Sequence, residues 1–197
     1  MRAAVAVDVP RGRFAEAIRE AEIALEQDPF NALVQSVFAV ISFLAGQFGR
    51  AQALAERAME LSENFWMPRF VMGITCALRG ELTQGFDWAK SALQLAQSHP
   101  LCVGLLAAVL ARSGEKELAD RLLGDQNRAT PGSFVIYHLL CSETDAAADW
   151  YEKAIAQKDP VAAVWAASDL FKPLRESPRW PALAKLMNLP QAVLGLR

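Results

Sequence analysis

The chain has 197 residues, which is enough for one ordinary domain or for a short array of repeated units. Hydrophobic residues make up 53% of it, charged residues only 21%, and the formal net charge is −2. The concentrated positive charge typical of nucleic-acid-binding proteins is therefore absent, and we expect no direct contact with nucleic acid. The high apolar content predicts a well-buried chain or one with an apolar binding face.

The three cysteines, Cys76, Cys102 and Cys141, have neither the even number nor the close spacing of a disulfide framework or a zinc site. No apolar run reaches the length of about 18 residues that a bilayer-spanning helix needs. The N-terminal stretch also lacks the apolar core of about 7–15 residues of a secretory signal. We therefore expect a cytoplasmic protein with reduced, buried thiols and no membrane partner.

The N-terminal part predicts an irregular segment followed by helices. Residues 1–12 show no helical periodicity, whereas apolar and small residues from Phe14 to Gln27 follow helical spacing. Asp28-Pro29 ends that helix, because a proline disfavours the helical conformation of the residue before it. Asn31 is suited to cap the next helix, which we expect to run to about Ala45.

The same apolar spacing predicts helices as far as residue 157. The expected ranges are Phe48–Leu61, Phe65–Arg79, Thr83–Gln97, Leu101–Arg112, Lys116–Leu123, Phe134–Leu140 and Asp145–Gln157. The helix 116–123 is short, and Gly124 to Gly132 is rich in turn-forming residues, so we expect a loop there. From Val161 onward, frequent prolines predict short helical pieces that cap the apolar end of the array.

Small residues recur at a constant step. Gly12, Gly46, Gly80 and Gly114 lie 34 residues apart, and each directly precedes a predicted second helix of a pair or the turn into it. Alanines in the second helix of each pair keep the same step: Ala17 and Ala51; Ala21, Ala55 and Ala89; Ala24, Ala58 and Ala92. A repeat of about 34 residues that contains two helices is typical of the tetratricopeptide (TPR) array.

Ala17-Ala21-Ala24-Pro29 resembles the second-helix alanines and the closing proline of the TPR family, and Gly73 matches its small first-helix position. The TPR tryptophan position is held instead by Gln35, Arg69 and Val103, so the repeats are degenerate. The resemblance implies an all-α, TPR-like α-solenoid of antiparallel helix pairs. It also implies a non-enzymatic, scaffold-like module that binds a protein or peptide partner.

These patterns predict a single domain over residues 1–197. We expect an irregular segment at 1–12, regular repeats at 13–123, a degenerate repeat at 124–160 and a capping segment at 161–197.

The C-terminal part has a second resemblance. Asp145 to Ala154, Lys158-Asp159-Pro160 and Phe171 to Trp180 are similar to the closing segment of TPR regions in bacterial proteins. In those proteins the region often follows a winged-helix DNA-binding domain or a nucleotide-cyclase domain. The resemblance implies, as an alternative, the C-terminal regulatory or sensing domain of a bacterial transcription regulator or signalling enzyme.

No pattern for catalysis, cofactor binding or a metal site is present in the sequence. His99 and His138 each have a cysteine three residues on, but neither pair has the third and fourth ligands that zinc needs. His99 precedes Pro100 at the start of a predicted helix, where capping is the expected role. Nucleophile elbows and glycine-rich phosphate loops are missing too. We therefore expect no enzyme activity and no cofactor.

The predicted binding site is the apolar concave groove lined by the first helix of each pair. The expected lining residues are Val37, Val40, Phe43, Met67, Phe70, Val71, Ile74, Leu78, Leu101 and Leu105. The expected lining contains no set of cationic residues that could clamp a peptide carboxylate. The nearest arginines are expected at the rim: Arg69, Arg79 and Arg112.

An exposed groove of this size would exceed the apolar patch of a typical monomer, so something must cover it. One alternative is the chain itself, through residues 1–10, the Val193-Leu194 tail or a tightly wound array. The others are a peptide or helix from a partner, and a second copy in a homodimer. A small-molecule sensor would need a closed apolar pocket in place of an open groove.

Overall fold

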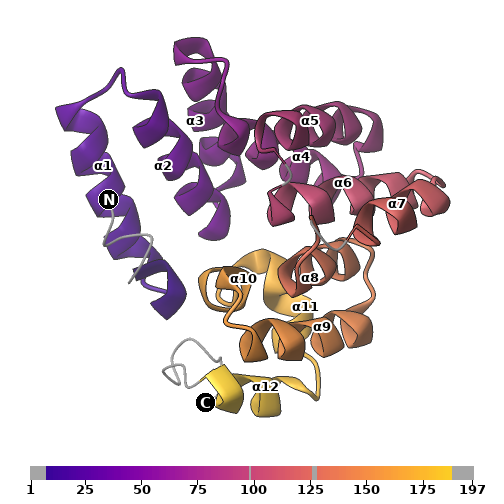
Figure 1. Cartoon of the computed structure of the whole chain (residues 1–197). Helices are drawn as coiled ribbons and strands as arrows, with labels where there is room; N and C mark the ends of the chain where they lie inside the picture. Colours follow the sequence, from indigo (N-terminus) through magenta and orange to yellow (C-terminus); the bar gives the residue numbers. More distant parts are fainter. Residues whose placement is uncertain (1–7, 98, 126–127, 188–197) are drawn as a thin grey trace.

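The computed structural model describes residues 8–97, 99–125 and 128–187, and every regular element in these ranges is helical (Figure 1). The array begins with a short 3₁₀ helix, η2 (Val9–Arg11), and continues with antiparallel helices. These are α1 (Phe14–Gln27), α2 (Ala32–Leu44), α3 (Phe48–Leu61), α4 (Trp66–Arg79), α5 (Leu82–Leu95), α6 (Pro100–Arg112), α7 (Lys116–Leu123), α8 (Pro131–Leu140) and α9 (Thr144–Ala156).

Helix boundaries follow from local chemistry. The Oδ1 atom of Asn31 accepts hydrogen bonds from the backbone N–H groups of Leu33 and Val34, at 3.0 and 3.2 Å, and so caps α2 as predicted. The turn glycines Gly46 and Gly80 have φ angles of 75° and 79°. Glycine adopts this left-handed conformation without strain, so each of the two glycines marks the end of a helix.

Buried small residues let the helices pack closely. On α3, Ala51, Ala55 and Ala58 are fully buried. On α4, a Cβ atom added to Gly73 would lie 3.1 Å from the backbone nitrogen of Ala89 on α5. The small residues are therefore required by the short distance between helix axes, as the alanine repeat predicted.

The predicted loop at 124–132 is shorter than expected at its C-terminal end. Pro131 is the first residue of α8, where its missing N–H is tolerated and its fixed φ angle suits a helix. Thr130 caps the helix, and its backbone N–H donates a hydrogen bond to Ser133 Oγ at 3.0 Å. Pro131 and Gly132, which the sequence assigned to the loop, are therefore the first two residues of α8.

After α9 the chain forms a cap of short helices: α10 (Pro160–Val164), the 3₁₀ helix η3 (Asp169–Phe171), α11 (Lys172–Arg175) and α12 (Trp180–Met187). A proline is the first or second residue of three of them, at Pro160, Pro173 and Pro181, so the proline density divides this region into short pieces as predicted. The buried Tyr151 hydroxyl of α9 donates a hydrogen bond to the Ala162 carbonyl at 2.6 Å and attaches the cap.

The cap lies on the inner side of the curved array. Figure 1 shows α1 to α7 as an arc, with α8 to α12 below it and α10 towards the lower end of α1. Helix α10 contacts η2, whose Val9 is fully buried. The first described residues and the cap thus meet across the concave side. Among the helices of the described ranges, none has the length and apolar character needed to cross a membrane.

The alanine packing gives a first prediction. Replacing the buried Ala51 by leucine should lower the free energy of unfolding by about 1–3 kcal/mol, because the added atoms force apart helices in close contact. Urea unfolding followed by circular dichroism measures the change. Ala53 is exposed on the same helix, so Ala53→Leu is the matched control and should change stability by less than about 0.5 kcal/mol. Equal losses in both variants would contradict this packing.

Candidate functional site

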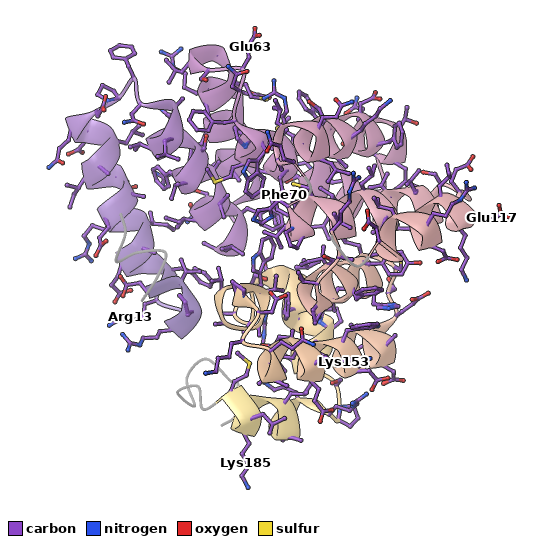
Figure 2. All side chains as sticks on the ribbon, in the orientation of Figure 1. Arg13, Glu63, Phe70, Glu117, Lys153 and Lys185 are labelled. Carbon is purple, nitrogen blue, oxygen red and sulfur yellow. The ribbon has the colours of Figure 1, made fainter. Side chains whose placement is uncertain are left out.

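The cap fills part of the concave face with an aromatic side chain. Trp165 follows α10, and its ring lies between Phe43 of α2 and Phe70 of α4, with centroid distances of 5.9 and 5.8 Å. Only 3% of Trp165 is exposed. In Figure 2 the labelled Phe70 lies near the centre of the molecule, whereas Glu63, Glu117 and Lys185 lie at its periphery. The inner face is therefore covered at this point by the chain itself.

This covering corresponds to one alternative from the sequence, but a different segment provides it. Most of the expected covering stretch 1–10, namely residues 1–7, and the Val193-Leu194 tail lie outside the described residues. The covering side chain is Trp165, in the part of the chain that was expected only to cap the array end.

An apolar pocket of about 430 Å³ remains beside Trp165, between the array and the cap. Ligand pockets in proteins commonly span about 300–1,000 Å³, so the pocket could hold one or two large side chains or a small organic molecule. Its lining comes from α2, α4, the start of α6, the start of α8 and α10: Val40, Trp66, Met67, Phe70, His99, Pro100, Leu101, Thr130, Asp159, Pro160, Val161, Val164 and Trp165.

Four residues of the predicted groove meet in this pocket: Val40, Met67, Phe70 and Leu101. The other six lie elsewhere. Val37 is partly buried outside the pocket lining, Phe43 is 2% exposed beneath Trp165, and Leu78 is 42% exposed near the end of α4. The remaining three are fully buried core residues: Val71, Ile74 and Leu105.

The three core residues show that the predicted concave face extended too far along the helices. Ile74 and Val71 lie on nearly the same side of α4 as Met67, but about two turns and one turn farther along. Leu105 likewise lies about one turn after Leu101 on α6, and a Cβ atom added to Gly73 of α4 would lie 3.1 Å from its Cδ2 atom. Here the helices pack against one another, so these residues are inaccessible to a partner.

His99 occupies one wall of the pocket and caps α6, the role that the sequence predicted for it. Its Nδ1 atom accepts a hydrogen bond from the backbone N–H of Leu101 at 3.3 Å. The imidazole stacks on Trp66, with ring centroids 4.3 Å apart. Burial lowers the pKa of His99, and the nearby Asp159 carboxylate only partly opposes this shift. The ring is therefore neutral at pH 7, with its proton on Nε2.

Asp159 also lines the pocket and connects the starts of α8 and α10. Its Oδ2 atom accepts hydrogen bonds from Thr130 Oγ1 at 2.7 Å and from the Gly132 N–H at 3.0 Å. Its Oδ1 atom accepts one from the Val161 N–H at 2.9 Å. A Cβ atom at position 132 would lie 2.7 Å from Oδ1, so glycine is needed there. Sequence analysis identified Asp159 only as a helix end.

The three cationic residues expected near the groove rim are engaged elsewhere. Arg69 donates a hydrogen bond to the Phe65 carbonyl at 3.0 Å, and Arg79 donates to Gln52 Oε1 at 2.9 Å. Arg112 donates to the Ala77 carbonyl at 2.7 Å. None of them lines the pocket.

The predicted histidine and cysteine pairs show no metal-site geometry. His138 Nδ1 lies 2.6 Å from Glu143 Oε2, and burial raises the pKa of the Cys141 thiol to about 11. Burial also raises the pKa of Cys102. Within residues 8–97, 99–125 and 128–187, no group of three or more His, Cys, Asp or Glu side chains is placed to hold a metal ion.

Comparison with known proteins identifies the fold. No family model matches the chain, and no curated protein matches it. Among solved structures, the chain is similar to the crystal structure of YrrB, a TPR protein with an unusual peptide-binding site. The match has a TM-score of 0.50 and 17% sequence identity, and it covers 89% of this chain and 96% of that one. The predicted TPR-like, all-α solenoid is confirmed.

The position of Trp165 gives a second prediction. Trp165→Ala should lower the free energy of unfolding by about 3–5 kcal/mol, because it removes a buried ring and leaves a cavity against Phe43 and Phe70. Trp165→Phe keeps an aromatic contact and should cost clearly less. Chemical unfolding of both variants provides the comparison. A loss below about 1 kcal/mol for the alanine variant would show that the cap does not pack on the array.

His99 gives a prediction about pH. Its pKa is lowered in the folded chain, so the unfolded chain takes up the proton first as the pH falls. The stability associated with the neutral ring is complete above the unfolded pKa of about 6.5 and decreases as the pH falls from there towards the lowered pKa. His99→Asn retains a capping side chain that does not titrate.

Urea unfolding at about pH 7.5 and about pH 5.5 measures this effect for both proteins. Wild type should lose more stability than His99→Asn over this interval. An equal loss in the two proteins would contradict the prediction, because it would mean that protonation of His99 does not destabilise the folded chain.

Proposed function

We propose that this chain is a non-enzymatic protein-interaction module that binds an apolar peptide or helix of a partner in the pocket beside Trp165. The pocket is the single observation that carries the proposal. The pocket is lined by four of the residues that the repeat pattern predicted for a binding groove: Val40, Met67, Phe70 and Leu101. The similar TPR protein YrrB has a peptide-binding site, which also favours a peptide as the ligand.

The exposed apolar side chain of Leu33 supports the same proposal. Leu33 on α2 is 48% exposed, and Val37 and Val40 follow it on one helical face and are partly buried. Val40 lies in the pocket wall. A stripe of apolar side chains therefore leads from the edge of the array to the pocket, which suits an amphipathic helix with anchors one turn apart.

The proposal treats residues 1–197 as one domain, in which the segment 161–197 contributes part of the binding site as well as closing the array end. Val161, Val164 and Trp165 of this segment line the pocket together with residues of α2 and α4. A partner would thus contact the repeats and the cap at the same time.

A second candidate function is a regulatory or sensing domain, such as the C-terminal part of a bacterial transcription regulator or signalling enzyme. The observation that favours it is the position of the apolar pocket between the array and the cap, since a small-molecule sensor needs an apolar site with walls on several sides. The C-terminal residues 145–180 resemble the closing segment of such regulatory regions.

A peptide selection tests the main proposal. A library of random 12-residue peptides displayed on phage is selected on wild type and on Val40→Glu. Wild type should enrich peptides with several large apolar residues, whereas Val40→Glu should enrich none of them, because it places a charge in the pocket wall. Melting curves of both proteins check that the variant folds.

Two results would contradict peptide binding in the pocket. One is the absence of any enriched apolar pattern on wild type; the other is the same enrichment on folded Val40→Glu. Light scattering separates the remaining alternative. A wild-type dimer that Val40→Glu converts to a monomer would show that a second copy occupies this face.

A further inference from the structure

The apolar walls of the pocket beside Trp165 favour an apolar ligand, and the charges around the pocket indicate which charge that ligand carries. Among the described residues that line the pocket, Asp159 is the one acidic side chain, and none of them is a Lys or Arg. His99 contributes no positive charge at pH 7, because burial lowers its pKa. The pocket therefore carries one negative charge in a largely apolar surface.

The Asp159 carboxylate has hydrogen bonds but no cationic partner. Oδ2 accepts two hydrogen bonds and Oδ1 accepts one, so Oδ1 has room for one more donor. No ion pair between Asp159 and a Lys or Arg side chain is found in the described part of the chain. The N–H groups of Gly132 and Val161 offset part of the negative charge. Because Asp159 is only partly buried, bulk water solvates the rest of it in the absence of a ligand.

A ligand that fills the pocket must replace this water. An apolar ligand alone would leave a carboxylate without solvent and without a counter-charge, which is strongly unfavourable. An acidic ligand would add repulsion. A positive charge on the ligand restores what the water provided and gains a charge-assisted hydrogen bond with Oδ1.

An aromatic wall favours the same ligand. Trp66 lines the pocket together with Asp159 and is partly exposed, whereas Phe70 and Trp165 are almost fully buried. The face of an aromatic ring attracts a cation, most strongly in the case of tryptophan. The methylene groups of a Lys or Arg side chain can also pack on Met67 and Leu101 while the charged end reaches the carboxylate.

From this arrangement we propose that the partner peptide pairs large apolar residues with a Lys or Arg, and that this basic side chain binds to Asp159 within the pocket. This proposal rests on the proposed function and adds the charge of the partner to it. A clamp for a peptide carboxylate would select the opposite charge. The arginines that could build such a clamp donate their hydrogen bonds to backbone or side-chain oxygens elsewhere; they are Arg69, Arg79 and Arg112.

The selection on phage described above tests the proposal when Asp159→Asn is added. Wild type should enrich peptides that combine large apolar residues with Lys or Arg. Asp159→Asn should keep the apolar pattern and lose the preference for basic residues, since the amide has no charge. Its one oxygen can still accept the hydrogen bonds from Thr130 and Gly132 but not that from Val161, and the melting curves measure the resulting loss of stability. Asp87 is exposed on α5 and does not line the pocket, so Asp87→Asn is the matched control and should select as wild type does.

A titration quantifies the effect. One enriched peptide is synthesised with its basic residue and with glutamine in its place, and binding is followed by fluorescence anisotropy. The basic peptide should bind Asp159→Asn at least about tenfold more weakly than wild type, whereas the glutamine peptide should bind both about equally. Melting curves confirm that Asp159→Asn is folded under the conditions used.

The possible failures are distinct. Apolar enrichment without a basic preference, or a basic preference that persists in Asp159→Asn, would overturn the present inference and leave the proposed function intact. No enriched pattern on wild type would overturn both. Octylammonium and octanol serve as small probes. If octylammonium alone binds, depends on Asp159 and no peptide is enriched, the ligand is a small amine and the peptide assignment is wrong.

Discussion

The contact of Trp165 with Phe43 and Phe70 is the interaction on which the shape of this molecule depends. A curved helical array leaves the inner faces of α2 and α4 apolar, and exposing those faces to water is unfavourable. The cap covers part of these faces, because its Trp165 side chain packs against the concave side of the array. As a consequence, α10 reaches η2 on the other side, and a pocket bounded by the array and the cap remains on the concave face.

The array itself was predictable because its determinants are local and periodic. Glycines such as Gly46 and Gly80 suit a helix that ends in a left-handed turn, and alanines such as Ala51 and Ala55 suit places where two helix axes approach closely. Both patterns return with each repeat, so spacing alone located α1 and α3 at their observed bounds. Pro131 was misassigned because a proline favours a loop and the first turn of a helix equally.

The pocket could be predicted only in part. The helical register placed Val40, Met67, Phe70 and Leu101 on the inner face, because they lie on the first helices of successive pairs. It could not show that Asp159 and Trp165 reach the same place, since the path of the cap is determined by packing between residues far apart in the sequence. It also could not show how far along the helices the accessible face extends, since Ile74 lies on nearly the same side of α4 as Met67 but about two turns farther along, where it is fully buried.

The central claim is that the cap packs into the concave face of the array through Trp165. Nuclear Overhauser effects on isotopically labelled protein test it directly, because they are observed only between protons about 5 Å apart or less. We expect cross-peaks between the Trp165 indole protons and the ring protons of both Phe43 and Phe70, as their centroid distances of 5.9 and 5.8 Å bring the ring edges closer than that. Cross-peaks from Trp165 only to residues of its own cap would contradict the account and would mean that the groove is open.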